Sequence, residues 1–421
     1  MAQHIIEEAK RCLQCKNALC KKGCPVGTPV NDAVEMLLSG QISDAGKLLF
    51  DNNPLSIVCS LVCPHEKFCE GSCVLGRKGN AIHWSTIEHY ISDYYLNKMD
   101  LQPQRDPEKK IAIIGSGPAG ITLAFVLAQK GYDITIFELR DKIGGVLQYG
   151  IPAFRLPKDI LDRLKDQLVN MGVKIRPNTL VGPVITIDDL FRDGYRAIFI
   201  GTGVWNPKPM RIKGESLGHV HYAIDYLKNP SSFQIGKKVC VIGAGNVAMD
   251  VARTAVRRGA KEVSIMYRRA EEDMPASQHE IKYAKLDGVK FEFFKSPVEI
   301  NDDGIKYYET KKVTEDGQEK LITLDGQDGR EGTLELFEAD TIIIAVSQGP
   351  KTNIIAHSKG IEIGKTGLVS TDNCGRTSRQ GVFASGDVVT GAKTVVEAVM
   401  FSKRVANAIE SYLDSSAETC E

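Results

Sequence analysis

Apolar residues follow a helical spacing in the first hundred positions of the chain. A short helix is predicted for residues 31–38, because apolar positions recur at that spacing and Gly40 follows them. A longer helix carries four apolar residues on one face: Trp84, Ile87, Ile91 and Tyr94. The polar stretch PQRDPEKK at 103–110 predicts a linker after these helices. We therefore expect an N-terminal helical domain over residues 1–107.

After the linker the pattern changes to continuous apolar strands that run into small-residue turns. The segment IAIIGSGPAG at 111–120 predicts a strand, a glycine-rich turn and a helix, which extends from about 121 to 129. The same arrangement returns as VCVIGAGNVA at 239–248, so one supersecondary unit is repeated. Later segments predict three more strands and a long amphipathic helix: FIGTG at 199–203, IIIAVSQG at 342–349, GVFASGDVV at 381–389 and the helix at 394–413.

This order of elements predicts an α/β fold with two Rossmann-like dinucleotide-binding domains, the second inserted in the first. The α-helical domain precedes both. At 421 residues the chain is too long for one compact core, which agrees with several domains. We place the first dinucleotide domain at 108–235 and 341–421, and the second at 236–340.

The charge balance narrows the classes of function. The chain has 53 basic and 53 acidic residues, which argues against a general affinity for nucleic acid or anionic membranes. No apolar run approaches the roughly 20 residues that span a bilayer. The N-terminus MAQHIIEEAKRC carries charges where a signal peptide needs an apolar stretch. We therefore expect a cytoplasmic protein with no membrane span and no nucleic-acid partner.

The cysteines are concentrated near the N-terminus, where eight of the eleven lie within residues 12–73. Their spacings are Cys12-x2-Cys15-x4-Cys20-x3-Cys24-Pro and Cys59-x3-Cys63-x5-Cys69-x3-Cys73. Two groups of four thiolates predict two four-iron clusters, and a Pro after the last cysteine of a run recurs in bacterial ferredoxin motifs. Two zinc sites or a disulfide framework are the alternatives. The remaining cysteines are interpreted as small buried hydrophobic residues: Cys240, Cys374 and Cys420.

The first glycine-rich turn predicts a flavin nucleotide. Gly115, Gly117 and Gly120 allow a tight turn, close approach of a pyrophosphate and close packing of the helix. Glu138 ends the next strand, where an acid holds ribose hydroxyls. Near the C-terminus, Asp387 follows a strand and offers a carboxylate to the ribityl chain of FAD, unless it only forms a turn.

The second turn predicts a nicotinamide nucleotide. Gly243 and Gly245 fit the pattern, and Ala248 stands at the third glycine position. The following strand ends in Arg268 and Arg269 where NAD would require an acid, so NADPH is favoured over NADH. The alternative is a solvated surface pair. No Cys-x-x-Cys lies near the flavin motif, which argues against a dithiol that would carry the electrons onward.

Several motifs follow one another along the chain: the two cysteine groups, GSGPAG, GGVLQYGIPAFRLPK, GAGNVAMD, YRRAEEDMPAS and FASGDVVTGAKTVVEAV. With these motifs in this order, the chain resembles the small (beta) subunit of glutamate synthase. That family includes the N-terminal half of dihydropyrimidine dehydrogenase, its separate bacterial subunit equivalent and the large subunit of a bifurcating ferredoxin:NADP oxidoreductase. The resemblance implies one cluster held by Cys12, Cys15, Cys20 and Cys73. It implies a second cluster held by Cys24, Cys63, Cys69 and Glu88, which leaves Cys59 without iron. The residues alone favour a solvent-facing charge for Glu88.

The resemblance also extends the set of expected cofactor contacts, and it assigns the loop 274–276 to the same signature. The full set is Gly115, Ser116, Gly117, Pro118, Ala119, Gly120, Glu138, Gly144, Gly145, Val146, Arg155, Val181, Gly243, Ala244, Gly245, Asn246, Val247, Arg268, Arg269, Gly386, Asp387 and Thr394.

The hypothesis that follows is hydride transfer from NADPH to FAD, and then single-electron transfer through the clusters to a partner. We expect no FMN-barrel or amidotransferase segment after residue 421, and therefore a separate catalytic or electron-accepting subunit, bound through the cluster domain. A glutamate synthase-like partner, dihydropyrimidine dehydrogenase or a bifurcating, ferredoxin-linked complex all fit. A free-standing NAD(P)H oxidase and a redox-sensing nucleotide-binding adaptor are the alternatives. Because the cofactors carry the chemistry, no catalytic side chain is assigned.

Overall fold

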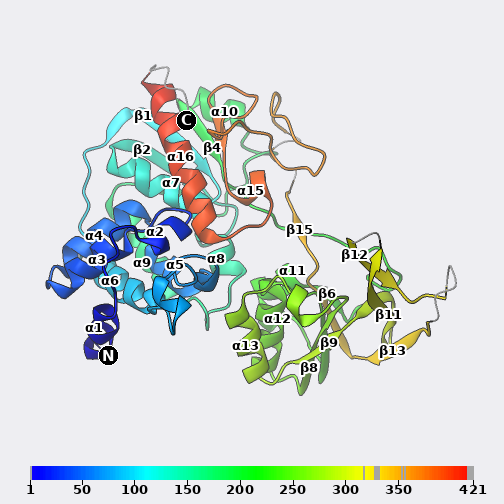
Figure 1. Ribbon diagram of the computed structural model, residues 1–421. Helices are drawn as coiled ribbons and strands as arrows, with labels where there is room; N and C mark the ends of the chain where they lie inside the picture. The colour runs from blue at the N-terminus through cyan, green and yellow to red at the C-terminus, as the bar shows by residue number, and fades with distance from the viewer. Residues whose placement is uncertain (1, 316–317, 327–331, 352–353, 355–356, 415–421) are drawn as a thin grey trace. The chain divides into compact units, whose positions relative to one another are not determined.

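The computed structural model describes residues 2–315, 318–326, 332–351, 354 and 357–414. The chain forms two compact units (Figure 1). Unit 1 contains residues 1–148, 153–206 and 349–421, and unit 2 contains residues 149–152 and 207–348. The expected second dinucleotide domain, 236–340, lies within unit 2. Short strands β5 (Asn206–Pro207) and β15 (Gln348–Gly349) pair where the chain passes between the units.

The N-terminal part of unit 1 is helical, as the spacing of its apolar residues predicted. Its elements are α1 (Ala2–Lys10), α2 (Leu19–Gly23), α3 (Val30–Leu38), α4 (Ile42–Asn52), α5 (Ser56–Val62), η1 (His65–Lys67), η2 (Val74–Arg77) and α6 (Trp84–Lys98). Trp84, Ile87 and Ile91 are buried in one core with residues of α3 and α4. Tyr94, which was expected on the same face, is 36% exposed. Glu88, which is only 4% exposed, lies on the buried face of α6 instead. The burial of Glu88 shifts the inward face of α6 from the one that hydrophobicity indicates.

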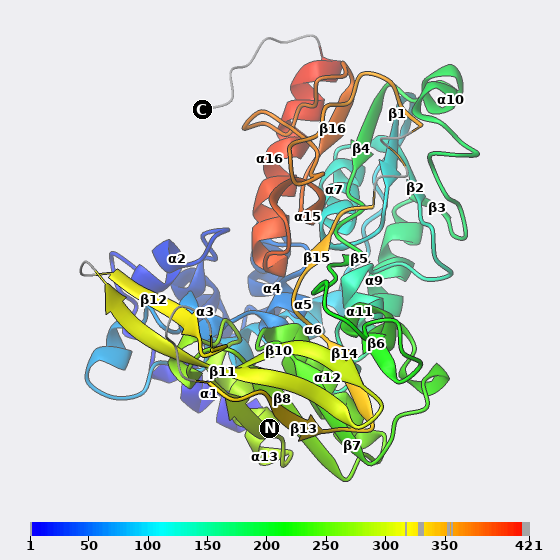
Figure 2. The same cartoon turned by 90° about the vertical axis from the view of Figure 1, so that its right-hand side faces the viewer.

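The rest of unit 1 is built on a five-stranded parallel sheet with the order β16-β4-β1-β2-β3. Its strands are β1 (Asp106–Ile114), β2 (Tyr132–Phe137), β3 (Lys174–Arg176), β4 (Ala197–Ile200) and β16 (Val382–Ala384). The accompanying helices are α7 (Pro118–Gln129), α8 (Val146–Tyr149), α9 (Asp159–Asn170), α10 (Ile187–Arg192), α15 (Asp387–Thr390) and α16 (Val395–Leu413). The long α16 runs beside α7 (Figure 2).

The expected linker at 103–110 is wrong in its second half. Strand β1 begins at Asp106, which pairs with Tyr132 of β2, and the register shifts between Asp106 and Lys110. The hydrogen bond from Asp106 N to Gly131 O (2.8 Å) belongs to the same pairing. Backbone pairing with a distant segment therefore makes a strand from residues whose side chains are polar, which a local pattern does not reveal.

The helical part and the sheet part of unit 1 pack against each other. The ring of Phe50 on α4 meets Phe125 on α7 edge to face, with centroids 5.2 Å apart. Arg163 of α9 forms an ion pair with Asp93 of α6 at 2.8 Å. Apolar and ionic contacts thus join the cysteine-bearing helices to the first dinucleotide fold.

Unit 2 has its own five-stranded parallel sheet, with the order β6-β14-β7-β8-β9. These strands are β6 (Val220–Tyr222), β7 (Lys238–Ile242), β8 (Glu262–Tyr267), β9 (Lys290–Phe293) and β14 (Thr341–Ile344). The helical elements are α11 (Ala223–Lys228), η3 (Pro230–Ser232), α12 (Asn246–Arg257), η4 (Glu271–Asp273) and α13 (Gln278–Leu286). A second, antiparallel sheet contains β10 (Lys295–Asn301), β11 (Gly304–Glu315), β12 (Gln318–Thr323) and β13 (Glu335–Glu338).

No helix within the described residues has the length and apolar character needed to cross a membrane.

Candidate functional site

The first glycine-rich turn joins β1 to α7 at the centre of the unit 1 sheet. Gly115 has a φ of +96°, and a Cβ there would lie 2.6 Å from the carbonyl oxygen of Gly201. At Gly120 a Cβ would overlap the carbonyl oxygen of Gly115, so both glycines serve the close packing of strand and helix. A Cβ on Gly117 would meet no heavy atom within 4 Å. The middle glycine therefore leaves open space at the start of α7, where a pyrophosphate fits.

Glu138 lies at the carboxyl end of β2, beside that turn. Its side chain is 6% exposed and accepts hydrogen bonds from Ser116 N (3.0 Å), Arg140 N (2.9 Å) and the Ser116 hydroxyl. Strand β1 lies between β2 and β4, and β4 leads to Trp205. The guanidinium group of Arg140 lies over the ring of Trp205, 4.4 Å from its centroid. The turn therefore has a fixed carboxylate where a ribose would bind, and an Arg–Trp pair that the sequence analysis missed.

A second pair of glycines lies against the same turn. Gly144 donates a backbone hydrogen bond to Ser116 O (2.9 Å), and a Cβ on Gly145 would lie 2.8 Å from the Cα of Gly117. Helix α8 starts at Val146. Arg155 is partly buried, and Val181 is 2% exposed in the apolar core of this domain, so its side chain serves packing.

The C-terminal segment of unit 1 reaches the first turn through Gly386. A Cβ on this residue, whose φ is +76°, would lie 3.0 Å from the Cβ of Ala119. Asp387 accepts a hydrogen bond from Lys393 N (3.1 Å), and burial raises its pKa to about 6. Thr394 caps α16 through a reciprocal pair with Glu397. Glu138, Asp387 and the space beside Gly117 together fit a flavin dinucleotide.

The second glycine-rich turn joins β7 to α12 in unit 2. A Cβ on Gly243, whose φ is +125°, would overlap the carbonyl oxygen of Ala345, whereas one on Gly245 would meet no heavy atom within 4 Å. Ala248 is fully buried. This repeats the geometry of the first turn, with the open middle glycine again at the start of a helix.

The loop at 274–276 packs on the second turn. Asn246 Oδ1 accepts a hydrogen bond from Ser277 N (2.8 Å), and Ala276 N donates to Ala244 O (3.3 Å). The side chain of Val247 packs against the core of unit 2. Asn246 therefore positions this loop with its side chain, while the backbone of the turn stays available to a nucleotide.

Arg268 and Arg269 are exposed at the carboxyl end of β8, the position at which Rossmann-like domains specific for NADP place a basic residue. The backbone around them is fixed, since Tyr267 donates its hydroxyl hydrogen bond to Asp273 O (2.9 Å). A hydrogen bond from Lys312 lowers the pKa of Asp273, and the charge of Arg269 adds to this effect. The basic pair therefore stands on a rigid loop with its guanidinium groups exposed.

The cysteines form two groups among the helices of unit 1. Burial raises the pKa of Cys12, and the nearby thiols of Cys15 and Cys73 add to it. Burial likewise raises the pKa of Cys20, with Cys12 and Cys73 as its neighbours. All four cysteines line one pocket, together with residues of α2, α3 and η2. The structure thus brings together the first ligand set that the family resemblance implied.

The second group surrounds Glu88. Burial raises the pKa of Cys63 and of Cys69 well above the ordinary thiol value, and Glu88 and Cys24 are among the ionisable neighbours of each. Burial also raises the pKa of Glu88 itself to about 8. Cys59, 3% exposed, is a further neighbour of Glu88. The residue type of Glu88 had suggested a solvent-facing charge, and its burial shows that this interpretation is wrong.

These side chains differ in arrangement from a mononuclear metal centre. Among the described residues, no three His, Cys, Asp or Glu side chains converge as they would around one metal ion. A four-iron cluster takes its four protein ligands at separate irons. Outside these groups Cys240 and Cys374 are buried, as predicted, and Cys374 is disulfide-bonded. Cys420 lies outside the described residues.

Two Rossmann-like units with open glycine turns, one beside buried acids and one beside arginines, define a flavoprotein that uses a pyridine nucleotide. Residues 85–191 and 109–401 match the family model of pyridine nucleotide-disulphide oxidoreductases. Residues 1–100 match the model for dihydropyrimidine dehydrogenase domain II, 4Fe-4S cluster. The chain is 34% identical to the glutamate synthase [NADPH] small chain of Escherichia coli, over 97% of this chain and 91% of that one. It is 32% identical to the NAD-dependent dihydropyrimidine dehydrogenase subunit PreT of Salmonella typhimurium, over 98% and 95% of the two chains.

The chain therefore belongs to the glutamate synthase small-chain family, which includes PreT. Among solved structures, FprA of Mycobacterium tuberculosis in complex with NADPH shares the fold, with a TM-score of 0.62 and 17% identity over 74% of this chain and 87% of that one. The predicted fold class is confirmed, and so is the function as an NAD(P)H-dependent flavin and iron–sulfur oxidoreductase that transfers electrons. The FAD/NADP fold and a 4Fe-4S domain are confirmed as well.

Proposed function

We propose that this chain takes electrons from NADPH, holds FAD and two [4Fe-4S] clusters, and delivers electrons singly to a separate catalytic subunit, as in a glutamate synthase. The observation that carries the proposal is the pair of glycine turns with unlike neighbours. Gly117 lies beside the buried carboxylate of Glu138, and Gly245 lies in the same unit as the exposed Arg268 and Arg269. An acid suits the ribose of FAD, and guanidinium groups suit a 2′-phosphate.

The residues of this chain bind and orient the cofactors. The open faces of Gly117 and Gly245 would accept the two pyrophosphates. Glu138 would bind the ribose of FAD, and Asp387 would bind its ribityl chain. Cys12, Cys15, Cys20 and Cys73 hold one cluster, and Cys24, Cys63, Cys69 and Glu88 hold the other. When bound, the nicotinamide supplies hydride, the flavin divides the electron pair, and the clusters carry electrons singly.

We assign residues 1–107 to the cluster domain, 108–235 and 341–421 to FAD, and 236–340 to NADPH. The partner subunit is expected at the cluster domain, and the protein in the cytoplasm. The relatives support an unlike partner, because the E. coli protein is the small chain of glutamate synthase and the Salmonella protein is a subunit of dihydropyrimidine dehydrogenase.

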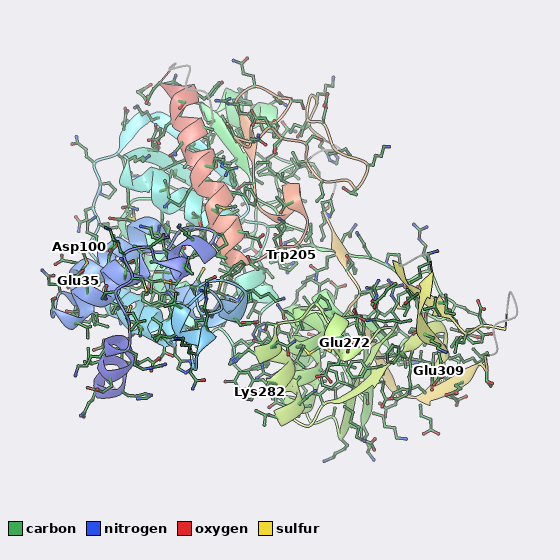
Figure 3. All side chains as sticks on the ribbon, in the orientation of Figure 1. Glu35, Asp100, Trp205, Glu272, Lys282 and Glu309 are labelled. Carbon is green, nitrogen blue, oxygen red and sulfur yellow. The ribbon has the colours of Figure 1, made fainter. Side chains whose placement is uncertain are left out.

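The preference for NADPH is tested by anaerobic stopped-flow reduction of the flavin with NADPH and NADH. The exchange Arg269→Gln removes a charge-assisted hydrogen bond, which contributes roughly 1.5–3 kcal/mol, so the apparent affinity for NADPH should fall about 10- to 150-fold. The affinity for NADH should stay within a factor of two of wild type. Lys282→Gln, which removes an equal charge from the exposed surface of α13, is the matched control (Figure 3). Equal effects on both nucleotides would contradict the proposed specificity.

The partner is tested by mild anaerobic purification from the native host, followed by identification of the polypeptides that remain bound. A co-purifying subunit that is reduced by NADPH only when this chain is present supports the proposal. Rapid turnover with oxygen and no bound subunit would instead support a free-standing oxidase. If NADPH fails to bleach the flavin, the electron-transfer function itself is wrong.

A further inference from the structure

One residue of unit 2 has a backbone conformation that its side chain disfavours. Phe294 directly follows β9 and has a φ of +58°, in the left-handed region that glycine adopts freely and an L-residue with a bulky side chain adopts only under constraint. Its side chain is 37% exposed. A glycine would make the reversal from β9 into β10 without strain. A large aromatic residue kept at such a position indicates a role for the ring.

Phe294 lies at the end of the sheet where we propose that the nicotinamide nucleotide binds. Strands β8 and β9 are parallel neighbours, with Tyr267 opposite Phe293, so Phe294 and Arg268 both follow the carboxyl ends of adjacent strands. Phe294 N donates a hydrogen bond to Arg269 O (3.4 Å). The aromatic residue therefore stands at the same edge of the sheet as the basic pair, where dinucleotides bind.

A buried threonine fixes the two segments to each other. Thr310 of β11 is 5% exposed, and its hydroxyl donates to Arg268 O (2.6 Å) while its backbone N donates to Phe294 O (2.8 Å). The antiparallel sheet thereby holds both the strained residue and the loop of the basic pair. The backbone of Phe294 is thus constrained on both sides by hydrogen bonds, which maintains the unfavourable φ.

We infer that Phe294 is the aromatic platform for the adenine ring of the nicotinamide nucleotide. This inference rests on the proposed binding of NADPH at Arg268 and Arg269. Adenine is attached to the ribose carbon next to the one that carries the 2′-phosphate, so a site that holds this phosphate brings the base close by. An aromatic side chain stacks on the face of a base and does not require particular groups elsewhere on the ligand. Phe294 therefore contributes equally to NADPH and NADH, whereas Arg269 distinguishes between them.

The test compares Phe294→Gly, Phe294→Trp and Arg269→Gln in the full-length holoprotein. Dissociation constants for 2′,5′-ADP and 5′-AMP are measured by titration calorimetry, together with thermal unfolding. Phe294→Gly should weaken both ligands about tenfold, and relief of the positive φ should leave the melting temperature unchanged or raise it. Phe294→Trp should keep the affinity. Reduction of the flavin by reduced nicotinamide mononucleotide, which has no adenine, should not change.

A matched control is Tyr283→Ala, which removes another exposed aromatic side chain of unit 2, 41% exposed on α13, and should leave both dissociation constants unchanged. Unaltered binding of both ligands to Phe294→Gly would overturn the inference, as would a lowered melting temperature together with equal loss of activity with the mononucleotide. If Phe294→Gly weakens both ligands while Arg269→Gln weakens neither selectively, the adenine platform stands and the proposed NADPH preference fails.

Discussion

The exchange Gly245→Ala separates nucleotide binding from folding. Gly245 has a φ of −84° and a ψ of 176°, an extended conformation that alanine adopts without strain. A Cβ there meets no heavy atom within 4 Å. Alanine is a poorer N-cap than glycine by about 0.5–1 kcal/mol, and the reduced entropy of the unfolded chain returns about 0.4–1 kcal/mol. The free energy of unfolding should therefore change by less than about 1 kcal/mol.

The same methyl group should weaken NADPH binding strongly. It extends about 1.5 Å from the Cα into the space where the pyrophosphate meets the start of α12. Displacement of the phosphate lengthens a hydrogen bond between backbone N–H and an anion, which contributes roughly 1.5–3 kcal/mol. The dissociation constant should rise about 10- to 150-fold. Stopped-flow flavin reduction at varied NADPH concentrations measures this constant, and urea unfolding measures stability.

Two comparisons make the result decisive. Gly218→Ala places a methyl group at another open glycine of unit 2 and should leave both quantities unchanged. Gly243→Ala would overlap the carbonyl oxygen of Ala345 at a positive φ, so it should lower stability by more than about 2 kcal/mol. A Gly245→Ala protein that binds NADPH with unaltered affinity would refute the assignment of the second turn to the pyrophosphate.

Three further predictions concern acids of unit 1 and a buried pair of unit 2. Glu88→Ala should alter the EPR spectrum of one reduced cluster and leave the other unchanged, whereas Cys59→Ser should alter neither; an unchanged spectrum for Glu88→Ala removes it from the ligand set. Burial raises the folded-state pKa of Asp387 from 3.8 to about 6, so the flavin-free protein should lose up to about 3 kcal/mol of stability as pH rises from about 4 to 6. Asp387→Asn should abolish this loss in thermal unfolding. Glu280→Gln removes one of the two acids that pair with the buried Arg253, at 2.8 Å, and leaves Asp287 at 2.9 Å. It should lower the urea-unfolding free energy by about 1–2 kcal/mol.

The parts of the fold that local sequence predicts are those in which backbone sterics leave few choices. At Gly115 and Gly243 a positive φ and a neighbouring carbonyl oxygen admit no side chain, so the glycines mark the two turns in the sequence itself. By contrast, β1 includes the polar residues from Asp106 because β2 offers a partner, and the polar stretch carries no sign of that partner. Burial of Glu88 depends on side chains of other helices, and only the family resemblance indicated it.

Phe294 and Thr310 illustrate the same limit at the candidate site. The sequence located Arg268 and Arg269 because they follow a strand of a recognisable βαβ unit. Thr310 reaches them from an antiparallel sheet more distant along the chain, and nothing in its local pattern of residues indicates that contact. Contacts that join separate elements depend on the folded topology, and they determine how the basic pair is held.

With the ligand sets proposed above, binding of iron would be coupled to folding of the helical part. The first set runs from Cys12 to Cys73 and the second from Cys24 to Glu88, so the two sets interleave along the chain. Burial raises the pKa of Cys12, Cys20, Cys63 and Cys69, so these groups resist ionisation unless a cation compensates. Cluster assembly must therefore release protons from thiols that the fold has already buried, or deprotonate them as the helices close. In either order, the side chains proposed to hold the clusters also connect the beginning of the domain to its last helix, so the proposed electron path depends on the integrity of the fold.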